Sequence, residues 1–167
     1  MLTLPLLSLL TAQARSDWGP CPDDDPLGAC RRISVPRDHD AADGPSLELA
    51  VKRYPPPSGT ERGQLWHITG GPGDSGLAAL PSLGGLHAEI APDYALLTLD
   101  VRGVGFSDRL SCAPEEMPDS PEGRALDDEE WLRCADSLTG DERLPTLTTI
   151  QTARDLVTAV EALRGEG

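Results

Sequence analysis

Hydrophobic residues along the chain fall into short runs that predict four strands. Apolar and polar residues alternate over residues 46–53, which predicts a half-buried antiparallel strand with Glu48 and Lys52 on its polar face. Residues 94–101 are apolar almost throughout, as expected of a strand covered on both faces. Shorter runs at residues 31–35, ended by Pro36, and 64–69 predict two further strands.

The end of the sequence has the pattern of an amphipathic helix over residues 152–164. Leu156, Val160 and Leu163 fall on one face, with Thr152 as the expected N-cap and Gly165 as the expected C-cap. A second, acidic helix is predicted over residues 127–137. The predicted order is two strands, then two further strands that each run into a turn, and finally a helix. This order indicates the α/β class.

The first residues resemble a secretory signal peptide. A short apolar stretch over residues 2–10 precedes Ala12-Gln13-Ala14, an A-x-A cleavage pattern. We therefore expect a signal peptide at residues 1–14 and a mature domain at residues 15–167, exported to the periplasm or the exterior. No Lys or Arg precedes the apolar stretch, so a buried N-terminal strand or helix stays open as the alternative.

Charge narrows the classes of partner. The chain of 167 residues carries 14 Lys and Arg against 28 Asp and Glu, a formal charge of −14. This balance argues against nucleic acid and against an anionic membrane surface. No apolar run approaches the ~20 residues of a spanning helix. Residues 113–145 are rich in acids and prolines, and we interpret them as a solvated surface excursion rather than a binding element.

Four cysteines support export. Their number is even, and their spacing lacks the paired C-x-x-C of a zinc site. In an oxidising compartment the local pairs Cys21–Cys30 and Cys112–Cys134 are preferred, although four cysteines allow three connectivities. Four free thiols in a cytosolic protein is the alternative.

Two glycine-rich turns follow two of the predicted strands. The first contains Gly70, Gly71, Pro72 and Gly73. Glycines at a strand end allow backbone N–H groups to face outward, where they can stabilise a developing oxyanion. A plain structural turn is the alternative for this segment alone.

The second turn runs over residues 100–107 and contains Asp100, Arg102, Gly103 and Gly105. Asp100 and Arg102 could pair near the strand end, and the two glycines permit a sharp reversal. Neither charged group has an evident reaction partner, so the chemistry of this turn alone favours a structural role.

Together the two turns resemble the α/β-hydrolase superfamily, and within it the branch of prolyl aminopeptidases and secreted tripeptidyl aminopeptidases. The resemblance rests on Gly-Gly-Pro-Gly after one strand, Asp-x-Arg-Gly-x-Gly-x-Ser after the next, and an early cysteine pair before Val35-Pro36. Thr148-Thr149 and Ala153-x-Asp155-Leu156 resemble the family's helix before the nucleophile. Thr69 departs from the family's usual His or Asn, so the resemblance carries over the shape of the turn and no side-chain role at that position.

This resemblance implies a fold and part of a site. The fold is the N-terminal part of an α/β-hydrolase, with antiparallel entry strands leading into a mostly parallel sheet. The backbone N–H groups of Gly70 and Gly71 would contribute to an oxyanion hole, with Gly71 favoured. No metal or organic cofactor is implied.

The family's catalytic triad has no counterpart in these residues. The Gly-x-Ser-x-Gly elbow belongs on the strand after the last helix, and the acid and His follow it. The resemblance therefore implies that the chain is truncated before the elbow and inactive alone. Peptide or small ester substrates would require completion by a C-terminal portion. A non-catalytic secreted module or relic is the alternative, and one half of a split enzyme is a less favoured third.

The remaining candidates are weaker. Ser75 lies in Gly-Asp-Ser-Gly, but its surroundings lack the partners of a triad, so we interpret it as a bystander. His67 is expected to be a core residue whose polar ring atoms have hydrogen-bond partners. His39 and His87 are expected to be exposed, and the three histidines lack the spacing of a helical zinc site.

Overall fold

A computed structural model describes residues 17–70, 73–112 and 126–164. Its strands are β1 (Ala29–Pro36), β2 (Ser46–Tyr54), β3 (Gly63–His67) and β4 (Tyr94–Leu99). Its helices are α1 (Gly76–Ala79), α2 (Gly84–Ile90), α3 (Asp128–Leu138) and α4 (Thr149–Leu163), with short 3-10 turns at Leu80–Leu83 and Leu144–Thr146. The predicted signal peptide at residues 1–14 lies outside the described residues, as do residues 113–125 of the acidic excursion.

The four strands form one mixed sheet in the order β1-β2-β4-β3. β1 pairs with β2 and β2 with β4 in antiparallel register, whereas β3 and β4 are parallel. The prediction of antiparallel entry strands leading into a parallel part of the sheet is confirmed, and among the described strands that parallel part is the pair β3 and β4. Because β3 and β4 run in the same direction, the segments that follow them leave the sheet at one edge.

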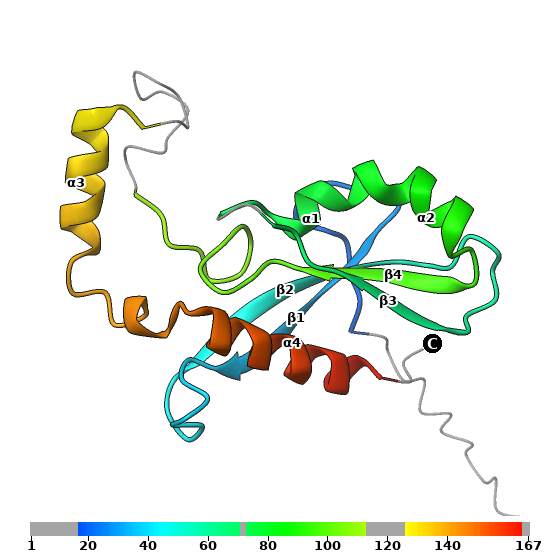
Figure 1. Ribbon diagram of the computed structural model, residues 1–167, viewed down its shortest axis with the longest axis horizontal. Helices are drawn as coiled ribbons and strands as arrows, with labels where there is room; N and C mark the ends of the chain where they lie inside the picture. Colours follow the sequence, from blue (N-terminus) through cyan, green and yellow to red (C-terminus); the bar gives the residue numbers. More distant parts are fainter. Residues whose placement is uncertain (1–16, 71–72, 113–125, 165–167) are drawn as a thin grey trace, which may run out of the picture.

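Helices cover both faces of the sheet, with α1 and α2 on one side and α4 on the other (Figure 1). The alternation of side chains along each strand divides the core accordingly. On the α4 side, Ala159 and Leu163 pack against a buried strand cluster made up of Ile33, Val35, Leu47, Leu49, Val51, Ala95, Leu97 and Leu99. On the other side, Leu77 packs near Ala50, and Leu80 packs with Tyr54 and Leu96.

The prediction of an exposed polar face on β2 is wrong at Lys52, which is fully buried. Its ammonium lies 2.7 Å from Asp23 Oδ2 and 2.6 Å from Asp25 Oδ2, and it donates to the Leu77 carbonyl. Burial alone would raise the pKa of Asp25, but hydrogen bonds from Lys52 and Tyr54 outweigh it and lower that pKa to about 2. The N-terminal segment thus covers the face that alternation alone assigns to solvent.

Both local disulfides are present. Cys21 is bonded to Cys30 and Cys112 to Cys134, with Cα atoms 4.8 and 5.1 Å apart. The first closes the segment that carries Asp23 and Asp25 against β1. The second connects the segment after β4 to α3.

The two long helices differ in how well the sequence predicts their ends. α3 lies within one residue of its predicted bounds at each end, and a capping box between Asp127 and Glu130 starts it. α4 begins one turn earlier than predicted, because the Thr148 side chain accepts from Gln151 N and takes the cap position assigned to Thr152. The predicted C-cap Gly165 lies outside the described residues, and Arg164 occupies the C-cap position.

Candidate functional site

The two glycine-rich turns lie beside each other at the carboxyl edge of the sheet. The first glycine turn (residues 69–76) follows β3 and the second (residues 100–107) follows β4, its parallel neighbour. Figure 1 shows both segments leaving the sheet toward the same side. In α/β proteins this edge is where ligands bind.

The first glycine turn combines an open start with a tightly packed end. Gly70 is exposed, and a Cβ added there would meet nothing within 4 Å. Gly73 has φ +96°, a conformation that favours glycine. At Gly76 a Cβ would lie 2.6 Å from the Leu99 carbonyl oxygen, so the start of α1 packs directly on β4. Gly71 and Pro72 lie outside the described residues, so their predicted roles stay predictions.

Asp100 joins the two turns. This buried carboxylate accepts through Oδ1 from Ser75 Oγ at 2.8 Å and from Leu77 N at 3.1 Å. Its Oδ2 accepts from Phe106 N at 2.8 Å. One side chain therefore fixes the start of α1 and the reversal of the second turn at the same time.

The second glycine turn is built around that carboxylate. Gly105 has φ +55°, and a Cβ there would lie 2.6 Å from Asp100 Cγ. Ser107 Oγ donates to the Asp100 carbonyl and accepts from Ala50 N, which ties the turn to β2. Gly103 has φ +78°, and a Cβ at Gly103 would lie 3.1 Å from Leu147. These contacts are consistent with the structural role that the sequence favours.

The expected pairing of Asp100 with Arg102 is wrong. Arg102 points to α4 and binds both carboxylate oxygens of Asp155, at 2.7 and 2.6 Å. It also donates to the carbonyls of Pro36, Arg37 and Thr146. Asp100 instead uses its oxygens on backbone and hydroxyl donors, so the two charged residues of the motif serve different connections.

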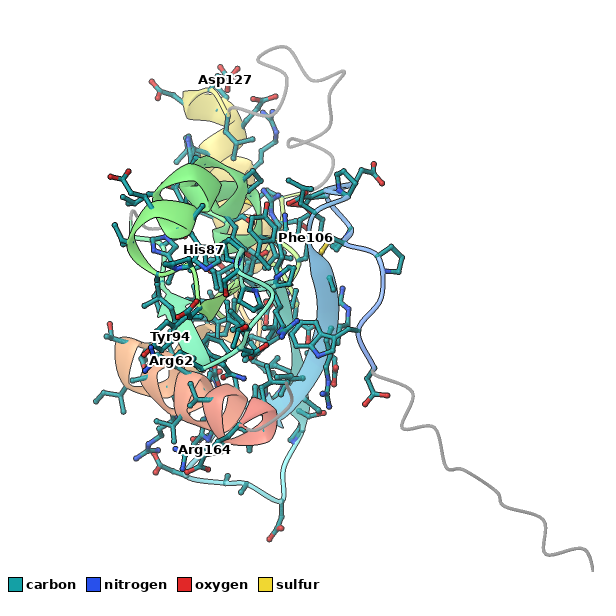
Figure 2. All side chains as sticks on the ribbon, turned by 90° about the vertical axis from the view of Figure 1, so that its right-hand side faces the viewer. Arg62, His87, Tyr94, Phe106, Asp127 and Arg164 are labelled. Carbon is teal, nitrogen blue, oxygen red and sulfur yellow. A yellow bond between two sulfur atoms is a disulfide. The ribbon has the colours of Figure 1, made fainter. Side chains whose placement is uncertain are left out.

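Two histidines are less exposed than predicted. His39 Nε2 lies 2.8 Å from Asp155 Oδ1, and only 12% of the His39 side chain is exposed. His87 belongs to α2 and is 4% exposed, with Nε2 2.7 Å from the Tyr94 carbonyl oxygen. Figure 2 places His87 and Tyr94 on neighbouring elements. Each ring has a hydrogen-bond partner that the sequence alone does not indicate.

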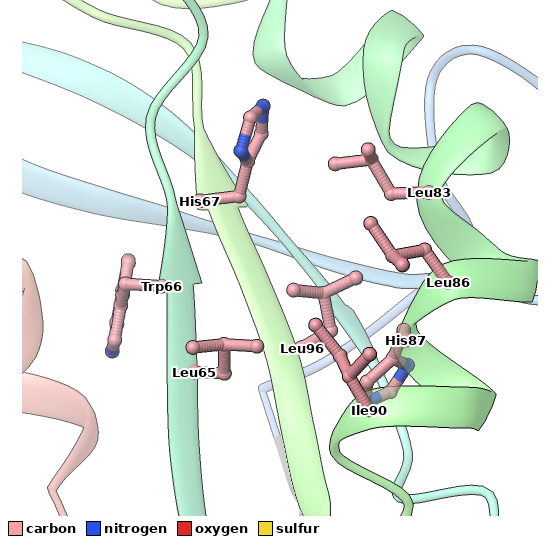
Figure 3. A pocket seen from close by; sticks show the side chains of 8 residues that line it. All are labelled: Leu65, Trp66, His67, Leu83, Leu86, His87, Ile90 and Leu96. Carbon is pink, nitrogen blue, oxygen red and sulfur yellow. The ribbon is translucent and has the colours of Figure 1, made fainter.

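His67 is half-buried and lines a small apolar pocket of about 190 Å³ between β3 and α2 (Figure 3). Its walls are mainly aliphatic side chains, including Leu65, Leu86 and Ile90. Thr69 Oγ1 lies 3.4 Å from His67 Nε2. The expectation of a core histidine is therefore met in part, because His67 is half-buried and lines a pocket.

Ser75, the serine of the first glycine turn, is engaged on both sides by structural hydrogen bonds. The Ser75 hydroxyl donates to Asp100 and caps α1 by accepting from Ala78 N. Within the described part of the chain, no serine hydroxyl is hydrogen-bonded to a histidine ring. Ser75 is therefore held in structural contacts, as its interpretation as a bystander requires.

Cys21, Asp23 and Cys30 form a group with possible metal-ligand atoms within 4.8 Å of one another. Both sulfurs are joined in the Cys21–Cys30 disulfide, so neither is a free thiolate.

In the described ranges, no helix has the length and apolar character needed to cross a bilayer.

Over most of its length the chain is similar to curated proteins that are named as peptidases. It is 34% identical over 176 residues to a tripeptidyl aminopeptidase of Streptomyces coelicolor and 33% identical to that of Streptomyces lividans. It is also 33% identical over 173 residues to the serine protease Hip1 of Mycobacterium tuberculosis. No family model matches the chain.

These matches cover at least 90% of this chain but only 32% of each relative. The chain thus spans about a third of the length of the curated relatives it matches. The resemblance that the glycine turns suggest extends over nearly all of these residues.

Proposed function

We propose that this chain, a relative of the tripeptidyl aminopeptidases over nine-tenths of its own length, supplies the oxyanion-stabilising part of a secreted serine hydrolase. The complete enzyme would cleave peptide or ester bonds through an acyl-enzyme, with a serine attacking and a histidine as base. The backbone N–H groups of Gly70 and Gly71 would bind the oxyanion.

The observation that carries this proposal is the position of the first glycine turn. Gly70 is exposed beyond the carboxyl end of β3, and further along the same turn the chain is held by the Ser75–Asp100 hydrogen bond and by the tight approach of Gly76 to β4. Donors held rigidly before the reaction stabilise an oxyanion better than donors that must reorganise. Loss of one such donor typically costs ~2.7–4 kcal/mol of transition-state stabilisation.

The nucleophile, base and acid would come from residues outside these 167. None of the serines stands in a Gly-x-Ser-x-Gly segment. The chain alone should therefore bind no substrate covalently. A separate, non-catalytic role for the same fold is the alternative, favoured by the structural contacts of every described motif residue in the second glycine turn.

A fluorophosphonate probe tests the proposal, because it labels serines that a base activates. The purified chain should remain unlabelled and should not hydrolyse an aminoacyl arylamide or a short ester. Labelling or hydrolysis that disappears in Ser75→Ala would show that Ser75 is a nucleophile and would overturn this assignment.

The coding sequence beyond residue 167 separates the two roles. A Gly-x-Ser-x-Gly segment within about 15 codons of the last helix, in any frame, is expected for a hydrolase. Its absence, together with a folded and soluble recombinant chain, would favour the non-catalytic module.

Export is the second part of the proposal. Two disulfides persist more readily in an oxidising compartment than in the cytosol, and the relatives' peptidase names are compatible with an extracellular location. Fusion of residues 1–20 to a reporter that is active only after export should yield activity. A reporter that stays in the cytosol would contradict the assignment of residues 1–14 as a signal peptide.

A further inference from the structure

Helix α3 has two faces of different character. Glu130 and Cys134, one turn apart, are 2% and 1% exposed and face inward. Trp131 and Leu132, on another side of the helix, are 58% and 73% exposed. With Ala135 at the next helical spacing they form an apolar surface that we name the α3 stripe (Trp131, Leu132 and Ala135).

Acidic side chains border the α3 stripe. Asp128 and Glu129 precede it by one turn, and Asp136 follows Leu132 by one turn, all of them exposed. Arg133 is the single basic residue of this helix. An exposed indole between carboxylates attracts cations by two interactions. One is with the carboxylate charges and the other is with the face of the ring.

The stripe is held in place before any partner arrives. The Cys112–Cys134 disulfide fixes the middle of α3, and the Asp127–Glu130 capping box fixes its start. Figure 1 shows the helix standing apart from the sheet, and Figure 2 places Asp127 at the opposite end of the molecule from Arg164. A preformed surface loses little conformational entropy on binding.

We propose that the α3 stripe binds a short cationic peptide segment, with a Lys or Arg over Trp131 and an aliphatic side chain on Leu132. From Asp128 to Ala135 the helix rises about 10 Å, which an extended peptide spans with about three residues. A second copy of the chain is a poorer occupant, because each copy carries a charge of −14. An anionic membrane is disfavoured for the same reason.

This inference goes beyond the proposed function and does not rest on it. It assigns a binding role to a helix in the acidic excursion, which the sequence alone indicates to be a solvated face. It holds whether or not the chain takes part in hydrolysis.

Tryptophan fluorescence of the whole chain tests the proposal, because Trp131 is far more exposed than the partly buried Trp18 and Trp66. The probe is the peptide acetyl-Leu-Arg-Leu-Lys-amide, with acetyl-Leu-Glu-Leu-Glu-amide as its charge-reversed match. The cationic peptide should move the emission to shorter wavelength saturably and protect it from iodide. The effect should weaken as salt rises.

Variants locate the site. Trp131→Phe should abolish the emission change, and in calorimetry Trp131→Ala should weaken binding about five- to tenfold. Asp128→Asn with Asp136→Asn should remove most of the salt dependence. Ile150→Ala, at an equally exposed apolar position on α4, should leave the affinity unchanged.

Four results would overturn the proposal. The first is the absence of a saturable response up to about 10 mM peptide, which corresponds to negligible affinity. The second is an equal response to the anionic peptide. The other two are a stronger response to phosphatidylcholine vesicles than to peptide, and an emission shift that follows protein concentration without peptide, which would indicate self-association.

Discussion

Ser75 and Asp100 are joined by a hydrogen bond of 2.8 Å from the serine hydroxyl to Oδ1, although 25 residues separate them. Ser75 belongs to the turn after β3, and Asp100 stands directly after β4. Because Asp100 also accepts from Phe106 N, the bond links the candidate oxyanion turn to the second glycine turn. The position of the first turn therefore depends on a side chain of the second.

Asp100→Asn is expected to destabilise the fold. The amide keeps the shape of the carboxylate but offers one acceptor oxygen, so at least one of the donors Ser75, Leu77 and Phe106 loses its partner. We expect a loss of about 2–3 kcal/mol in the free energy of unfolding, measured in urea. Asp74→Asn, at an exposed neighbour, should stay within about 0.5 kcal/mol of the parent. Equal losses in both variants would contradict the role of Asp100.

Gly105→Ala should be among the most damaging glycine substitutions. Its φ of +55° disfavours any side chain, and the new Cβ would overlap the Asp100 carboxylate. We expect a loss of more than about 2 kcal/mol in urea unfolding. Gly85→Ala is the matched control, because Gly85 lies in α2 with nothing within 4 Å of its added Cβ. That variant should gain about 0.4–1 kcal/mol, and a loss there comparable to that of Gly105→Ala would refute the argument.

Arg102→Gln breaks a buried ion pair. The substitution leaves the Asp155 carboxylate, which is fully buried, without its bidentate partner. Such a loss typically costs about 3–5 kcal/mol. Arg154 lies on the same helix as Asp155 and forms an exposed ion pair with Asp40. Arg154→Gln removes that pair and should cost less than about 1 kcal/mol. Thermal or urea unfolding of the two variants should separate them clearly, and similar midpoints would contradict the prediction.

Stability should fall in acid between about pH 4 and pH 2 as Asp25 takes up a proton. Its pKa is about 2 in the folded chain, below the usual 3.8 of an aspartate, so its stabilising contribution is complete above pH 4 and is lost as pH approaches 2. Unfolding free energies across this range should show a shallower decline in Asp25→Asn than in the parent. Asp17→Asn, at an exposed acid paired with Arg31, should leave the decline unchanged. A parent-like decline in Asp25→Asn would assign the acid sensitivity to other carboxylates.

Much of the sheet follows from hydrophobic pattern. The alternation in β2 and the continuous apolar run of β4 predict those strands within two residues of their observed ends. α1 and α2 are absent from the prediction, because each is shorter than the span over which a helical period can be recognised. Lys52 breaks the alternation rule because its burial depends on Asp23 and Asp25, more than 25 residues earlier.

The candidate site likewise has features that follow from the sequence and features that do not. The two glycine turns are recognisable in the sequence, and they share an edge because β3 and β4 are parallel neighbours, which the sequence indicates only through the family resemblance. The partners of its charged residues do not follow. Asp100 and Arg102 stand two positions apart, which suggests a pair, yet Arg102 meets Asp155 across 53 residues. The spacing of residues in the sequence gives no information on partners so far apart. The role of the Gly71 N–H in the oxyanion hole remains a prediction.

The contacts of Arg102 also bear on the order in which the chain can fold. Its guanidinium binds carbonyls at Pro36 and Arg37 and the carboxylate of Asp155, so its partners come from both ends of the described chain. During synthesis, the guanidinium cannot be desolvated favourably until α4 has left the ribosome. The early strands and the last helix should therefore be acquired in one late, cooperative step, with slow kinetics set by long-range contacts.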